Sequence, residues 1–286
     1  MKYIKGDRVR HPIKNEWGLG EVLEDSRGSQ VRIFFVEVGE KTLDLNYVEP
    51  EKVSGEEAKH RGLDNLSVAT IKGRIKYQSL PQSIERFLER FPEGFNGKRF
   101  LTEERNFKVK AHELALELMD REQFSMLLDG EDYREICIRA LKVVNATNLI
   151  FPNEKMALKD GLDSTEKEQA FSKSLFQLLY GEGELEGRFM AFAKVLEDLG
   201  ADKWTTASYF LFILIPDKYM FVKPMVTTNA AEISAIELNY RPQLNWLTYK
   251  SVLEFSEYLR SALAELKPRD MIDVQSFMWC ISPYKP

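Results

Sequence analysis

Residues 199–214, LGADKWTTASYFLFIL, combine a glycine, a short polar turn and an apolar run. The amphipathic pattern of residues 187–199 comes just before them, so we expect a first helix to end at Gly200 in a left-handed cap. A second, apolar helix then begins at Trp204 or Thr205. The sequence therefore predicts a helix-turn-helix hairpin. The exposed amides and positive dipole end of its second helix would form a site for a phosphate.

Apolar residues recur at i, i+3 and i+4 through most of the chain around this hairpin. The windows with this pattern are residues 83–91, 110–119, 133–144, 168–180, 187–199, 204–214, 249–266 and 273–281. We therefore expect a large all-α domain over residues 80–286, with eight or more helices.

The first 53 residues have a different pattern, in which short apolar stretches are separated by glycines. Residues 31–38, VRIFFVEV, alternate as a strand does, and the turn SRGSQ at 26–30 suits a hairpin. Residues 1–53 therefore predict a small five-stranded β-barrel, and the polar residues 54–79 predict a linker. The expected fold class is α+β multidomain.

The charge balance restricts the possible partners. The formal net charge of -5 argues against a protein that coats nucleic acid with a whole basic face. Residues 59–110, however, hold twelve Lys or Arg against six Asp or Glu, a local net of +6. This run indicates either a phosphate-binding surface or an ordinary solvated face.

Several classes of protein are disfavoured. Cys137 and Cys280 form no CxxC pair, and the three histidines at 11, 60 and 112 lack ligand-like spacing, so we expect no metal and no cofactor. The start, MKYIKGDRVRHP, lacks the apolar core of a signal peptide, and no apolar run is long enough to cross a bilayer. We expect a cytoplasmic protein without a membrane partner.

Two stretches at the front, GDRVRHPIKNEWGLGEVLE (6–24) and VRIFFVEVGEKTL (31–43), resemble a short helicase-associated domain of unknown function. That domain is of the Tudor-like or SH3-like type and is similar to small barrels in some bacterial helicases and transcription-repair proteins. The resemblance implies a docking module for nucleic acid or for a protein partner such as RNA polymerase. His11 and Trp17 would be contact residues, although Trp17 is equally suited to closing the barrel core.

The hairpin itself resembles the helix-hairpin-helix DNA glycosylases of the alkylation-repair type. Their hairpin is written roughly L-x-G-I-G-x-W-T-A, which Leu199, Gly200, Trp204 and Thr205 match. Residues 216–232, PDKYMFVKPMVTTNAAE, fit the segment that follows. The resemblance covers about thirty-five residues and implies a DNA duplex with a flipped base as substrate. Gly200, Lys203, Trp204 and Thr205 are then predicted to contact nucleic acid.

The chain departs from this motif at two positions. Asp202 replaces the second hairpin glycine and puts a negative charge where a phosphate would approach, with Lys203 as the local compensation. The position of the catalytic aspartate is taken by Lys223, or by the neighbouring Pro224 or Met225. The carboxylate of the family is missing there.

Lys223 and two aspartates are candidate replacements for the missing group. Lys223 lies beside apolar residues that would lower its pKa and let its amine attack the sugar carbon, or else it is a surface lysine before a helix-capping proline. Asp270 and Asp273 begin the C-terminal helical window, where either would act as acid or base or simply cap the helix. Weaker candidates are Asp160 and Asp163.

The same C-terminal window offers groups that could recognise a base. Gln275 is predicted to contact a base edge and Trp279 to stack on an extruded base. An aromatic residue in such a helix is equally suited to the core.

Three functions follow as hypotheses. The first is a DNA glycosylase that flips and excises a damaged or modified base, in repair or in defence against modified foreign DNA. The second is a non-catalytic adaptor that binds DNA or a transcription or repair partner, and the missing aspartate favours it. The third is a nucleosidase on the same scaffold.

Overall fold

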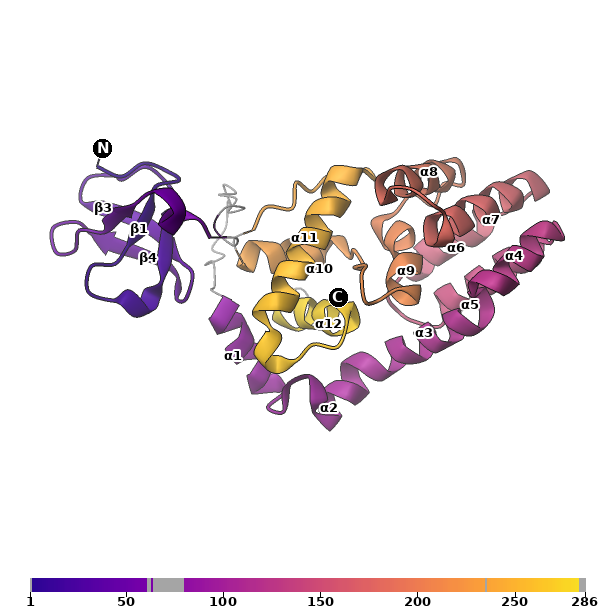
Figure 1. The fold of residues 1–286 in the computed structure, drawn as a ribbon, viewed down its shortest axis with the longest axis horizontal. Coiled ribbons are helices and arrows are strands. Elements are labelled where there is room, and N and C mark those ends of the chain that lie inside the picture. Colours follow the sequence, from indigo (N-terminus) through magenta and orange to yellow (C-terminus); the bar gives the residue numbers. More distant parts are fainter. Residues whose placement is uncertain (1, 61–62, 64–79, 235, 283–286) are drawn as a thin grey trace. The chain divides into compact units, whose positions relative to one another are not determined.

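The N-terminal part of the chain forms a small antiparallel sheet, consistent with the barrel expected there. The computed structural model describes residues 2–60, 63, 80–234 and 236–282 (Figure 1). Among these residues the sheet has five strands in the order β4-β3-β2-β1-β5, and each neighbouring pair is antiparallel. The strands are β1 (Arg8–Arg10), β2 (Leu19–Val22), β3 (Gln30–Phe35), β4 (Gly39–Asp44) and β5 (Glu51–Val53).

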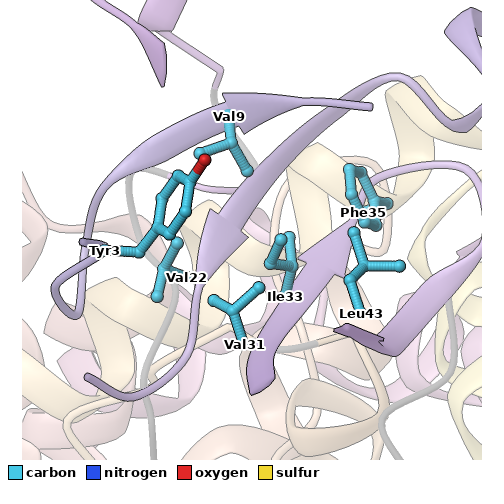
Figure 2. Close-up of a cluster of buried hydrophobic side chains, with 7 residues drawn as sticks. All are labelled: Tyr3, Val9, Val22, Val31, Ile33, Phe35 and Leu43. Carbon is cyan, nitrogen blue, oxygen red and sulfur yellow. The ribbon is translucent and has the colours of Figure 1, made fainter. Parts of the chain in front are cut away.

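Alternation along β3 distributes its side chains between two apolar clusters. Ile33 and Phe35 lie in the larger cluster, whereas Phe34 lies in the smaller one with Leu19 and Leu23. Successive side chains of a strand point to opposite faces, so β3 buries apolar side chains on both faces, while Gln30 at its start is exposed and Arg32 is half-exposed. The larger cluster, shown in Figure 2, comprises Tyr3, Val9, Val22, Val31, Ile33, Phe35 and Leu43.

Trp17 packs against this larger cluster. Its ring centroid lies 5.2 Å from that of Phe35 and 4.7 Å from that of His11, and His11 is only 4% exposed. The amines of Lys14 and Lys41 lie 4.4 and 5.9 Å from the same ring. Trp17 therefore lies at the edge of the core, as expected if it closes the barrel core.

From residue 80 the described chain is mainly helical, and each of the eight windows with a helical pattern contains a helix. Helices α4, α6 and α10 lie outside those windows. The longer helices are α1 (Leu80–Arg90), α3 (Asn106–Met119), α4 (Arg121–Asp129), α5 (Tyr133–Asn145), α6 (Pro152–Gly161), α7 (Thr165–Tyr180), α8 (Leu185–Asp198), α9 (Trp204–Leu214), α10 (Pro224–Ile233), α11 (Trp246–Ala262) and α12 (Met271–Ile281). A short α2 (Lys98–Phe100) and a π-helical turn (Leu101–Arg105) lead directly into α3.

Helix α9 is the most buried of these helices. Every residue from Trp204 to Leu214 is buried, and α9 packs against α3, α6, α7 and α8. A helix that is apolar on all sides must be surrounded by other elements, and this one is. None of the helices in the described residues has the length and apolar character needed to cross a bilayer.

The chain divides into two compact units. The first comprises Met1–Gly94, Thr228–Leu238 and Met278–Pro286, and the second comprises Phe95–Thr227 and Asn239–Phe277. Most of the predicted linker, at residues 61–62 and 64–79, lies outside the described residues. The α8–α9 hairpin belongs to the second unit, so the site can be described within that unit alone.

Candidate functional site

The α8–α9 hairpin has the local geometry that the sequence predicts. Gly200 adopts a left-handed conformation with φ of 69°. The amide of Ala201 donates to the carbonyl oxygen of Leu196 at 2.8 Å, and the amide of Gly200 donates to that of Glu197 at 2.9 Å. These two bonds form a Schellman cap, and α9 begins after a three-residue turn. The predicted end of the first helix and start of the second are confirmed.

A cavity of about 330 Å³ lies at this hairpin. Its walls come from the turn, the first residues of α9 and α10, the first turn of α6 and the segment before α11. The lining residues are Glu154, Asp202, Lys203, Trp204, Thr205, Pro224, Tyr240, Pro242 and Gln243. Small-molecule sites typically measure about 300–1,000 Å³, so this hairpin cavity is large enough for one small group such as a nucleobase.

Glu154, in the first turn of α6, brings a carboxylate to the hairpin cavity. Its Oε2 accepts a hydrogen bond from Thr205 Oγ1 at 2.9 Å and another from the amide of Phe151 at 3.2 Å. Within the described residues Oε1 accepts no hydrogen bond. One carboxylate oxygen is therefore fixed by two donors, while the other remains available to a molecule in the cavity.

The other end of α6 explains how this helix comes so close to the hairpin. A Cβ atom at Gly161 would overlap the carbonyl oxygen of Leu199, the C-cap residue of α8. A glycine is therefore needed at that contact. Pro152 occupies the first turn of α6, where a missing N–H costs no helical hydrogen bond.

Lys223 adjoins the lining residue Pro224 but is not itself part of the lining. Its side chain is buried, with Nζ 4.3 Å from the centroid of the Phe151 ring and a hydrogen bond of 3.4 Å to the carbonyl oxygen of Leu149. Burial lowers the pKa of Lys223, and the negative charge of Glu154 acts in the opposite direction. Lys223 thus contacts the same segment that positions Glu154.

The aromatic lining of the hairpin cavity comes from Trp204 and Tyr240. Trp204 is 2% exposed, its ring stacks on Phe189 with centroids 6.2 Å apart, and its Nε1 donates to the carbonyl oxygen of Arg241 at 2.9 Å. Trp204 is therefore a fixed wall. Tyr240 is 36% exposed, and burial raises the pKa of its hydroxyl. Tyr240 is therefore the lining ring with more exposed surface.

The turn contributes charges of both signs. The side chains of Asp202 and Lys203 are 44% and 55% exposed, with Asp202 Oδ1 and Lys203 Nζ 3.9 Å apart. Together with Glu154 the lining therefore holds two carboxylates and one ammonium group.

Asp270 and Asp273 lie together in a buried ion network and do not line the hairpin cavity. Arg105 Nη2 lies 2.6 Å from Asp270 Oδ2, and Arg105 Nη1 lies 2.8 Å from Asp273 Oδ1. Arg269 Nε lies 2.8 Å from Asp273 Oδ2. Asp270 Oδ1 also accepts from the amide of Ile272 at 3.0 Å. Asp270 thus acts as a cap at the start of α12, one of the two roles considered for it.

The remaining predicted groups are not brought to the hairpin cavity either. Gln275 is 3% exposed, and its buried Oε1 has no hydrogen-bond partner in the described part of α12 and its surroundings. Trp279 is half-buried in the last turns of α12. Asp160 is exposed, and Asp163 lies 3.0 Å from Lys167 on the surface.

Part of the basic run from 59 to 110 is internal. Lys108 is 2% exposed, and its Nζ donates to Ser276 Oγ at 2.7 Å. Arg105 is largely buried in the ion network of Asp270 and Asp273. Four further basic residues of the run, Arg61, Lys72, Arg74 and Lys76, lie outside the described residues. Among the described residues of the run, Arg105 and Lys108 are therefore not part of a basic surface.

Residues 4–53 match the model of one protein family. Its description is "Protein of unknown function (DUF3553)". The match spans all the strands from β1 to β5, in agreement with the domain of unknown function that the sequence resembles. No curated protein and no solved structure matches the chain. Among the described residues, no group of three or more His, Cys, Asp and Glu side chains is arranged to hold a metal ion.

The sequence alone did not single out Glu154 or Tyr240. A Glu two residues after Pro152 predicts only the start of a helix. Its partner Thr205 lies 51 positions away. No local pattern reveals such a long-range pair, so only the folded chain identifies it.

Proposed function

We propose that the protein binds DNA and that its helical part cleaves the glycosidic bond of a damaged or modified base flipped into the hairpin cavity. The observation that supports this proposal is the Glu154 carboxylate at the cavity. The hairpin resembles that of DNA glycosylases but lacks their aspartate, and α6 supplies a carboxylate to the same hairpin through Thr205.

The chemistry of base excision suits these groups. An extruded base needs a close-fitting pocket with aromatic and hydrogen-bonding walls. Cleavage builds positive charge on the sugar, which a fixed carboxylate stabilises. The exposed ammonium group of Lys203 would attract a phosphate near the turn, opposed by Asp202.

The N-terminal sheet has a different proposed role, as a Tudor-like or SH3-like docking module. The supporting observations are the family match over residues 4–53 and two large side chains on its surface, Ile13 at 79% and Tyr47 at 87% exposure. Such a module would bring the helical part to DNA or to a transcription or repair partner in the cytoplasm.

Alkali-induced strand scission tests the proposed cleavage. Duplexes carrying one alkylated, deaminated, oxidised or glucosylated base are incubated with the full chain, and borohydride is added in parallel to trap any amine adduct. The corresponding free nucleosides are assayed alongside. Scission of a modified duplex but not of the unmodified one is the expected result. Release of bases only from free nucleosides would indicate a nucleosidase instead.

A non-catalytic adaptor is the second candidate, and the Asp202 carboxylate at the turn favours it. Binding to duplex DNA that weakens steeply with salt, without scission of any duplex, would support the adaptor and contradict base excision.

A further inference from the structure

We infer that Glu154 is the catalytic carboxylate of the hairpin cavity, with Thr205 as its positioning residue. This inference rests on the proposed glycosidic cleavage and assigns that reaction to a group on α6, outside the hairpin motif. Within the second unit, Glu154 combines two features required of such a group: it lines the cavity, and its Oε1 makes no hydrogen bond with the described chain.

Lys223 and Asp273 lack both features, whereas Asp202 lines the cavity and differs from Glu154 in being exposed. Lys223 is not in the lining, and its Nζ is engaged with the Phe151 ring and the carbonyl oxygen of Leu149. Asp273 is completely buried, with both carboxylate oxygens paired to arginines. Asp202 lines the cavity but is exposed on a turn, where water screens its charge.

The position of Glu154 is fixed from two sides. Thr205 is 1% exposed and sits in the first turn of α9, a helix that is buried along its whole length. The Phe151 amide belongs to the N-terminal cap of α6. Both donors bind Oε2, so the carboxylate is held in one orientation before any substrate arrives.

The reaction can be written with Glu154 as the base. Glu154 removes a proton from a water molecule as the water oxygen forms a bond to the sugar C1′. The bond between C1′ and the base nitrogen breaks, and its electron pair leaves with the base, which takes a proton from solvent. Glu154 then returns its proton to solvent. The products are the free base and an abasic sugar, and no oxidant or metal is needed.

The deciding variant is Glu154→Gln. Glutamine also serves in the capping position, and its carbonyl oxygen can still accept from Phe151 and Thr205. The fold is therefore preserved, while the carboxylate that accepts the proton is lost. With the duplex that wild type cleaves, we expect single-turnover cleavage to fall by about 100-fold or more. The affinity for that duplex should stay within about twofold. Glu186→Gln, an exposed carboxylate in the first turn of α8, is the matched control.

Chemical rescue separates catalysis from a structural role. Formate added to Glu154→Ala should restore part of the lost cleavage, because a small carboxylate can occupy the vacated volume. Thr205→Val should lower kcat more than it raises KM, since it removes only the donor that orients Glu154.

The outcomes distinguish this inference from the proposed function. Cleavage by wild type and by Glu154→Gln at similar rates would overturn the role of Glu154 and leave base excision standing. A complete lack of cleavage by wild type would overturn base excision, and the role of Glu154 with it. Loss in both Glu154→Gln and Glu154→Ala, with formate rescue of the latter, supports both.

Discussion

Arg105 Nη1 lies 2.8 Å from Asp273 Oδ1 and so ties α12 to the π-helical turn before α3, across 168 positions of sequence. The Asp273 side chain is completely buried, and Arg269 occupies its second oxygen at 2.8 Å. A buried ion network of this kind is costly to break, because removing one partner leaves the remaining charges less well compensated.

Asp273→Asn is therefore expected to lower the free energy of unfolding by up to about 3 kcal/mol, less than for a fully uncompensated charge, because Arg105 keeps Asp270 and Arg269 is partly exposed. The matched control is Asp198→Asn, because Asp198 pairs with Lys194 at 3.1 Å on the surface. That exposed pair should contribute about 0–1 kcal/mol. Urea unfolding curves of the two variants make the comparison. An Asp273→Asn protein as stable as wild type would show that the network is not structural and would return Asp273 to the catalytic candidates.

His11 is expected to make the stability of the N-terminal sheet depend on pH. Burial lowers the pKa of its imidazole, and the charge of Lys14 acts in the same direction. Its Nδ1 accepts from the amides of Ile13 and Lys14 at 3.2 and 3.0 Å. Both bonds require an unprotonated nitrogen, so protonation opposes the fold.

The sign of this effect follows from linkage. An unfolded histidine titrates at about pH 6.5, and His11 in the folded protein binds the proton less tightly. The stability that His11 contributes is therefore complete above about pH 6.5 and is lost as the pH falls toward its folded pKa. In His11→Asn this loss should be absent, because the Asn oxygen can accept the same amides without titrating. Urea unfolding at pH 7.5 and 5.5 measures the fall in the free energy of unfolding. An equal fall in wild type and in His11→Asn would refute the prediction.

The two cysteines should differ greatly in reactivity. Burial raises the pKa of the Cys137 thiol to about 12, whereas Cys280 is only half-buried. At pH 8 a thiol of pKa 12 is ionised to about one part in ten thousand, against roughly a quarter for an ordinary thiol. In the native protein Ellman's reagent should modify Cys280 more than 100-fold faster than Cys137. Cys280→Ser isolates the slow thiol, and rapid modification of that variant would contradict the assignment.

Much of the helical fold could be predicted because the helices carry their apolar residues at helical spacing. The pattern also located the hairpin, since Gly200 can take a positive φ and Trp204 begins an apolar run. The periodic pattern does not reveal helices α4, α6 and α10, although one alternative for Lys223 places a helix start at Pro224. They are short, and α6 and α10 begin at prolines, so local signals mark only where they start. Helix α6 also packs against α9, whose residues lie far away in sequence.

The part of the candidate site that could be predicted is the part formed by neighbours in sequence. Lys203, Trp204 and Thr205 lie together at the hairpin cavity because they are neighbours in sequence. Asp273 fits the pattern of a polar residue at a helix start, but such a residue serves a buried ion network equally well. Which use applies depends on Arg105, and sequence distance hides that partner. The role of Asp273 as a catalytic acid or base and the contact of Gln275 with a nucleobase edge stay predictions.

Gly161 offers a test of the contact that holds α6 against the hairpin. A methyl group at this position would overlap the carbonyl oxygen of Leu199, which is backbone and cannot rotate away. Gly161→Ala should therefore displace α6 and lower the free energy of unfolding by about 1–3 kcal/mol. Because Glu154 lies on the same helix, the displacement should also weaken its hydrogen bond with Thr205 and reduce any cleavage.

Gly187→Ala is the matched control, because Gly187 lies within α8 and a Cβ there meets no atom within 4 Å. Alanine is favoured over glycine in a helix, so this variant should gain about 0.5–1 kcal/mol. Urea unfolding of both variants gives the difference, and the same proteins can be compared in the scission assay. If Gly161→Ala is as stable as Gly187→Ala, α6 can move without cost. The carboxylate of Glu154 would then not be held rigidly at the cavity, and its assignment as a preorganised base would lose its main support.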